Sequence, residues 1–131
     1  MLIFLQNRSM KKTVDKDIVS SKMIALLDSI KSSFSAEAFN EETLAQMKEL
    51  REMFKAVQQP TIVKSVRLVY EHLSEYGNLD SLPYWEQEEI ELDNQQTSIC
   101  YYLDLLYNPS NKYNKEEIKE INAMLKEIAE G

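Results

Sequence analysis

The chain has 131 residues, and its 22 acidic and 15 basic side chains give a net charge of −7. A chain of this length suggests one domain, because it can bury roughly two-thirds of its unfolded surface around a single core. Two glycines and three prolines are too few for the many tight turns of an all-β fold, and a single cysteine excludes an intrachain disulfide. No stretch approaches the roughly 20 apolar residues that cross a bilayer, so we expect a cytoplasmic protein that makes no membrane contact.

The N-terminal half predicts three amphipathic helices after a loose start. Residues 1–13 are interpreted as a flexible N-terminal arm, and residues 14–131 as a single helical domain. Apolar side chains recur at helical spacing in three segments, which are 15–34, 41–58 and 61–76. Asn40 is a suitable N-cap for the second segment, Thr61 can cap the third, and Gly77 is placed to end it.

The most apolar stretch of the chain is 97–108, where only Asp104 interrupts the run from Ile99 to Tyr107. A buried strand would suit so short a run, but Leu-Asp-Leu-Leu followed by Asn108-Pro109 favours a helix and its end. A helix that is apolar on nearly every side is usually buried. The sequence therefore predicts an all-α bundle of about five helices with the 97–108 helix at its centre.

The last helix is expected to begin after Asn114 as its N-cap. Its apolar residues follow near-heptad spacing and are Ile118, Ile121, Leu125 and Ile128. The segment 86–93 is ambiguous, since its alternation of acids with Ile90 and Leu92 fits a strand. A helix running from Pro83 into the central helix is the preferred alternative, because no pairing strand is evident elsewhere.

The charge is distributed unevenly along the chain. Residues 1–67 hold 11 Lys and Arg against 8 Asp and Glu, whereas residues 68–131 hold 4 against 14. Residues 68–111 contain no Lys or Arg, and five of their nine acids fall within 86–93. An open acidic face of this kind attracts a basic partner. The alternative is a solvated acidic face that only aids solubility.

Tyr84 and Trp85 directly precede the acids, and these residue types often anchor protein interfaces inside a polar rim. A core position for Trp85 is the alternative. The predicted partner-binding residues are Tyr84, Trp85, Glu86, Glu88, Glu89, Glu91 and Asp93.

The chemistry of catalysis and of metal binding has few candidates in this chain. His72 is the only histidine, and Cys100 lies in an apolar setting that opposes a reactive thiolate. Glu86, Glu89 and Asp93 would share one face if the segment were helical, as metal-binding carboxylates can. No glycine-rich phosphate loop or nucleophile elbow occurs. We therefore predict no catalytic residue, no cofactor and no metal, and a protein that is not an enzyme.

These observations favour a small acidic module that binds and covers a basic site on a protein partner. An inhibitor, an immunity protein or antitoxin, and a phage anti-defence protein all fit that description. A helical DNA-binding regulator that uses residues 58–67 is an alternative, with a homodimer formed through the last helix, although the net charge argues against nucleic acid. A structural helical domain is the second alternative.

Overall fold

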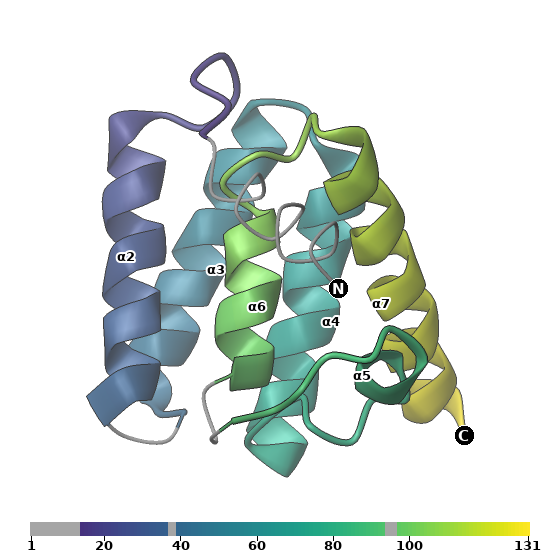
Figure 1. Cartoon of the computed structure of the whole chain (residues 1–131). Coiled ribbons are helices and arrows are strands. Elements are labelled where there is room, and N and C mark those ends of the chain that lie inside the picture. The colour runs from purple at the N-terminus through teal and green to yellow at the C-terminus, as the bar shows by residue number, and fades with distance from the viewer. Residues whose placement is uncertain (1–13, 37–38, 94–96) are drawn as a thin grey trace.

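Six helices lie in residues 14–36, 39–93 and 97–131, which are the residues that the computed structural model describes (Figure 1). Their bounds are α2 Ser21–Ala36, α3 Glu41–Ala56, α4 Pro60–Tyr76, α5 Tyr84–Gln87, α6 Thr97–Leu105 and α7 Lys112–Glu130. No strand occurs within these ranges, so the all-α prediction is confirmed. The arm predicted at residues 1–13 lies outside the described residues.

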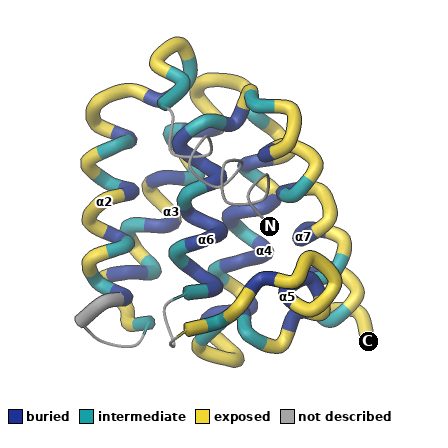
Figure 2. Tube along the Cα trace, viewed as in Figure 1, coloured by how far each residue is buried: buried dark blue, intermediate teal, exposed yellow. Residues whose placement is uncertain are grey.

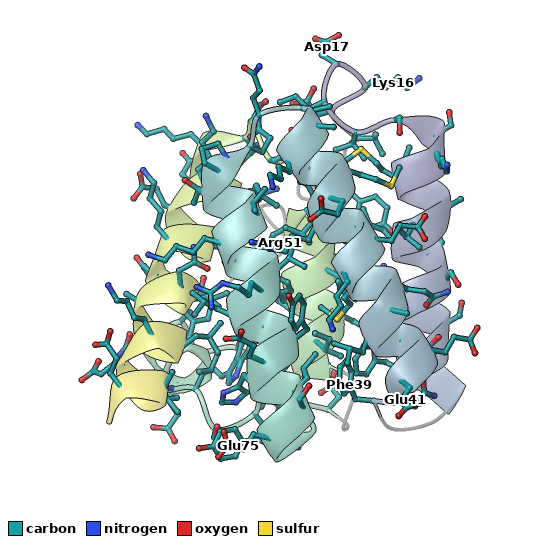
Figure 3. All side chains as sticks on the ribbon, turned by 180° about the vertical axis from the view of Figure 1, so that it is seen from behind. Lys16, Asp17, Phe39, Glu41, Arg51 and Glu75 are labelled. Carbon is teal, nitrogen blue, oxygen red and sulfur yellow. The ribbon has the colours of Figure 1, made fainter. Side chains whose placement is uncertain are left out.

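The helices α3 and α4 run antiparallel side by side and form one face of the bundle (Figure 3). On the inner side of this pair stands α6, with α2 and α7 on either side of it (Figure 1). All six of the described helices share one core, and α5 contributes Tyr84 and Trp85 to it. The other five each contribute fully buried side chains. Examples, one from each helix, are Leu27, Leu50, Val66, Leu103 and Ile121.

The central position predicted for residues 97–108 is confirmed, because no residue of α6 is exposed (Figure 2). Its neighbours reach it with polar contacts as well as apolar ones. The Tyr102 hydroxyl lies 2.8 Å from the Ser65 hydroxyl of α4, and the Lys31 ammonium of α2 lies 2.6 Å from the Asp104 carboxylate. The helix is shorter than predicted, since residues 106–107 form a turn.

The start of α2 lies later than the sequence suggested. The hydroxyl oxygen of Ser20 accepts a hydrogen bond from the backbone N–H of Met23 at 3.2 Å, so Ser20 is the capping residue. The segment before it is a turn rather than helix. For α3 the expected cap is confirmed, because the Asn40 side chain accepts from the N–H of Thr43 at 2.9 Å.

The start of α4 also differs, because Pro60 is its first residue rather than the end of α3. Proline suits this position, since its missing N–H would have no partner there. Thr61 therefore lies inside the helix and is not its cap. Before it, α3 ends with Gln58 in the left-handed region at φ 58, and the N–H of Gln59 bonds back to the carbonyl of Phe54 at 3.1 Å.

The N-cap of α7 is Asn111, not Asn114 as predicted. The Asn111 side chain accepts hydrogen bonds from the N–H groups of Tyr113 and Asn114. Asn114 is buried, and its amide donates to the carbonyls of Leu105 at 3.2 Å and Asn108 at 3.0 Å. It thus satisfies carbonyls at the end of α6 that have no partner within their own helix.

Candidate protein-binding surface

Tyr84 and Trp85 open α5, and both side chains belong to the core, with 0% and 3% of their surface exposed. The indole N–H of Trp85 donates to the carbonyl of Leu79 at 2.7 Å, and its ring meets Tyr101 edge-on at 5.5 Å between centroids. The core alternative therefore holds for Trp85, and the interpretation of these two side chains as exposed anchors is wrong. Tyrosine and tryptophan, which carry a polar group on an apolar ring, occur both in cores and at interfaces, so residue type alone could not distinguish the two positions.

The helix α5 has a single turn because Glu89 ends it in the left-handed region, with φ 54. The N–H of Ile90 bonds to the carbonyl of Trp85 at 2.8 Å, and that of Glu89 bonds to Glu86 at 3.2 Å. This pair of bonds is the Schellman arrangement that terminates helices. The preferred prediction of a continuous helix from Pro83 into the central helix is therefore wrong.

The chain after α5 keeps the alternation seen in the sequence without forming a strand. Ile90 is buried and Leu92 packs against the core, whereas Glu91 and Asp93 are exposed. An extended chain directs successive side chains to opposite sides, so two apolar residues hold the segment down while the acids face water.

All five carboxylates of the segment are exposed, and no Lys or Arg among the described residues forms an ion pair with any of them. These residues are Glu86, Glu88, Glu89, Glu91 and Asp93. Cations of the first half of the chain pair elsewhere: Lys31 with Asp104 at 2.6 Å, and Arg67 with Glu71 at 3.1 Å. The negative field of the segment is therefore not neutralised by these cations.

The first part of α7 adds further acids, because α5 packs against it. Partial burial raises the pKa of Glu120, and the nearby charge of Glu88 raises it further. Glu117 and Glu116 contribute in the same direction. We call the exposed residues of this region the acidic face. Its members are Glu86, Glu88, Glu89, Glu91, Asp93, Glu116 and Glu120.

A carboxylate of α7 fastens α5 in place beneath this face. The hydroxyl groups of Tyr84 and Tyr101 both donate to the same oxygen, Oε1, of Glu117. Burial, followed by the bond to Glu117, raises the pKa of Tyr84 well above its usual range. Its phenol therefore stays protonated and donates, which links α5, α6 and α7 through one charge-assisted contact.

A hollow of about 550 Å³ lies beside the acidic face, between residues 80–83 and 86–92. Its apolar lining includes Leu82, Trp85 and Ile90, and its carboxylates are Asp80 and Glu86. An apolar lining with carboxylates at its edge suits the long hydrocarbon stem and charged end of a lysine or arginine.

The candidates for catalysis lie apart from this surface. His72 is buried in α4, where its ring lies at a tilt against that of Tyr76, with 4.5 Å between centroids. Burial lowers the pKa of His72, although Glu75 opposes that effect, so the imidazole is neutral at pH 7. Cys100 is partly buried on α6, near Tyr107.

The helical face expected for Glu86, Glu89 and Asp93 does not form, because α5 ends at Gln87. In the described part of the chain, no group of three or more His, Cys, Asp or Glu side chains is arranged to hold a metal ion. The described helices also include none with the length and apolar character that crossing a membrane requires.

Residues 58–67 span a turn and the start of α4, but α4 lies side by side with α3 (Figure 3). A helix-turn-helix crosses its two helices at a steep angle so that the second can enter the major groove. The near-heptad stripe of α7 is also occupied, since Ile118, Ile121 and Leu125 are buried and α7 packs on α4. These arrangements oppose the recognition-helix alternative and the homodimer predicted with it.

Comparison with protein-family models, curated proteins and solved structures finds no match to this chain. Functional inference therefore rests on its own residues. Sequence reasoning found the acids of 86–93 but missed Glu116, Glu117 and Glu120. Their only signal was the acidic run at the start of the last helix, and the nearness of Glu120 to Glu88 follows from how α5 packs on α7.

Proposed function

We propose that this protein is a binding module whose acidic face covers a basic site on a protein partner. The observation that carries the proposal is the set of five exposed carboxylates in 86–93 without a cationic partner in the described residues. Like charges crowded on one surface oppose folding unless something offsets them. A Lys- or Arg-rich partner would do so and would be drawn in rapidly by the same field.

The surface is also held firmly, which favours specific over diffuse attraction. The buried side chains of Trp85 and Ile90 anchor the segment to the core, and the Tyr84 hydroxyl bonds it to Glu117 of α7. A surface that is already ordered loses less conformational entropy when it binds. The adjoining hollow, lined by Trp85 and Glu86, offers a place for one basic side chain of the partner.

Inhibitors, immunity proteins, antitoxins and phage anti-defence proteins that mask a nuclease or another basic protein would act in this way. A cytoplasmic setting is part of the proposal, because a chain with a single cysteine forms no intrachain disulfide.

The test is an NMR titration of isotope-labelled protein with a short arginine- and lysine-rich peptide at low salt. We expect amide shifts concentrated in 86–93 and 116–120, and their loss as salt is added. A peptide of equal length without arginine or lysine is the control. Shifts spread evenly over the molecule, or none at all, would contradict the proposal.

A further inference from the structure

A second charged region lies where α3 ends and α4 begins. A hollow of about 390 Å³ there is lined by four cationic side chains, and its remaining lining is neutral. Two of the cations come from α3 and two from α4: Arg51, Lys55, Lys64 and Arg67. In a protein whose net charge is −7, a hollow with four cations and no acid in its lining is unexpected.

A smaller hollow of about 170 Å³ adjoins the first, and both are lined by Gln59 and Pro60. The smaller hollow adds Lys115 and Lys119 from α7. Six of the chain's 15 Lys and Arg therefore line these two adjoining hollows. We call the pair the basic hollow.

Two of its six cations have carboxylate partners, and both partners lie outside the lining. Arg67 pairs with Glu71 at 3.1 Å, and Arg51 lies 3.5 Å from Glu52. The guanidinium of Arg51 is also positioned by donating to the carbonyl of Val63 at 3.2 Å. It lies between α3 and α4 (Figure 3).

The other four cations form no ion pair with any described carboxylate. They are Lys55, Lys64, Lys115 and Lys119. Collecting unpaired like charges around a hollow destabilises the fold in the absence of a counter-charge. A bound anion would remove that repulsion.

We infer that the basic hollow binds a ligand that carries two or more phosphate groups. A single carboxylate would balance only one of the four cations that line the larger hollow. Arginine forks and lysine ammonium groups are the usual partners of phosphate oxygens, and Gln58 and Gln59 add neutral hydrogen-bonding groups. The larger hollow falls within the size range of small-molecule sites, roughly 300 to 1,000 Å³. A free polyphosphate or nucleotide and the backbone of a nucleic acid share this chemistry.

The larger hollow is separate from the part of the acidic face that α5 forms. The basic hollow lies at the start of α4, and α5 follows its far end (Figure 1). The 17 residues of α4 span about 25 Å at about 1.5 Å per residue. The four cations of α3 and α4 are therefore set apart from α5, whereas on α7 the two regions are neighbours, because Lys115 and Lys119 adjoin Glu116 and Glu120. The two sites can be tested separately, and failure of one leaves the other standing.

The test measures binding of two probes, inorganic tripolyphosphate and a single-stranded thymidine oligonucleotide, to the full chain at low salt. The variant K55Q/K64Q removes two exposed cations of the basic hollow that have no ion pair. The variant K22Q/K126Q removes two exposed lysines elsewhere and changes the net charge equally. K55R/K64R preserves the charge and serves as the rescue.

We expect saturable binding of at least one probe, weakened about tenfold by K55Q/K64Q, less than about twofold by K22Q/K126Q, and retained by K55R/K64R. Equal affinity for both probes would point to a free polyphosphate ligand. Tighter binding of the oligonucleotide with a steep salt dependence would point to a nucleic-acid backbone. The inference is overturned if neither probe binds more tightly than about 1 mM, or if both glutamine variants weaken binding alike.

Discussion

The hydroxyl of Tyr84 donates to the Glu117 carboxylate across the contact between α5 and α7. A hydrogen bond to a charged group contributes about 1.5 to 3 kcal/mol to stability. Tyr101 still donates to the same carboxylate when Tyr84 is changed. We therefore expect Tyr84→Phe to lower the free energy of unfolding by about 1 to 2 kcal/mol.

Urea denaturation measures this effect, and Tyr113→Phe is the matched control. Tyr113 is 58% exposed, so its change should stay within about 0.5 kcal/mol. A Tyr84→Phe protein as stable as the unchanged one would show that the contact does not hold α5 in place.

Substitutions that add or remove glycine at two helix ends should change the stability of the fold in opposite directions. Gln58 has φ 58, and an L-residue in that region costs about 1 to 2 kcal/mol. Because glycine also loses more chain entropy on folding, we expect Gln58→Gly to stabilise by about 0.5 kcal/mol. Gly77 has φ 82 and open space at its Cβ position, so Gly77→Ala should destabilise by about 1 kcal/mol through the backbone alone. Thermal unfolding of both variants checks the signs. Equal signs would contradict the assigned conformations.

The single histidine predicts a dependence of stability on pH. Burial lowers the pKa of His72 in the folded chain below its ordinary value of 6.5. As the pH falls below about 6.5, the unfolded chain binds a proton that the folded chain does not. This contribution is therefore complete above that pH and is lost as the pH falls toward the lowered folded-state value.

Urea unfolding at about pH 7.5 and about pH 5.5 tests this expectation. The fall in stability between the two should be smaller for His72→Gln than for the unchanged protein, whatever the variant's absolute stability. The same slope in both proteins would assign the pH dependence to carboxylates instead.

Crowding within the acidic face predicts that losing one carboxylate stabilises the fold. The raised pKa of Glu120 reflects partial burial and then Glu88. We expect Glu120→Gln to raise the free energy of unfolding by a few tenths of a kcal/mol at low salt and by less at high salt. Glu130→Gln, at the far end of α7, is the control. A loss of stability in Glu120→Gln would show that a partner cation neutralises this carboxylate.

The helices were predictable because their signal is local. Apolar residues at helical spacing placed α3, α4 and α7 to within a few residues of their ends, and the apolar run of 97–108 placed α6 at the centre. The same spacing also located α2, although its start was predicted at residue 15 and lies at Ser21. The errors lie at the ends, where one hydrogen bond decides. Ser20 and Asn111 are caps that the apolar pattern does not single out, and Pro60 starts a helix that it was expected to precede.

The surfaces were only partly predictable. Runs of like charge are visible along the chain, so the acids of 86–93 were found. Trp85 is buried through its contacts with Leu79 and Tyr101, which the pattern around Trp85 does not reveal. The basic hollow includes Lys55 of α3 and Lys115 of α7, which are far apart in the sequence and share a region only through the packing of both helices on α4. The spacing of residues in the sequence does not predict such a site.

The central claim is that the acidic face, rather than the net charge of the molecule, binds a basic partner. Two variants with the same net charge of about −3 separate these possibilities. One replaces four acids of the face by glutamine: Glu86, Glu88, Glu89 and Glu91. The control replaces four exposed acids of α3: Glu41, Glu42, Glu49 and Glu52.

The most direct measurement is the affinity of each variant for the arginine- and lysine-rich peptide, determined by fluorescence anisotropy at several salt concentrations. We predict that the variant of the acidic face binds about tenfold more weakly with a flatter salt dependence, and that the α3 variant changes less than about twofold. Equal weakening of the two variants, or no weakening in either, would contradict the claim.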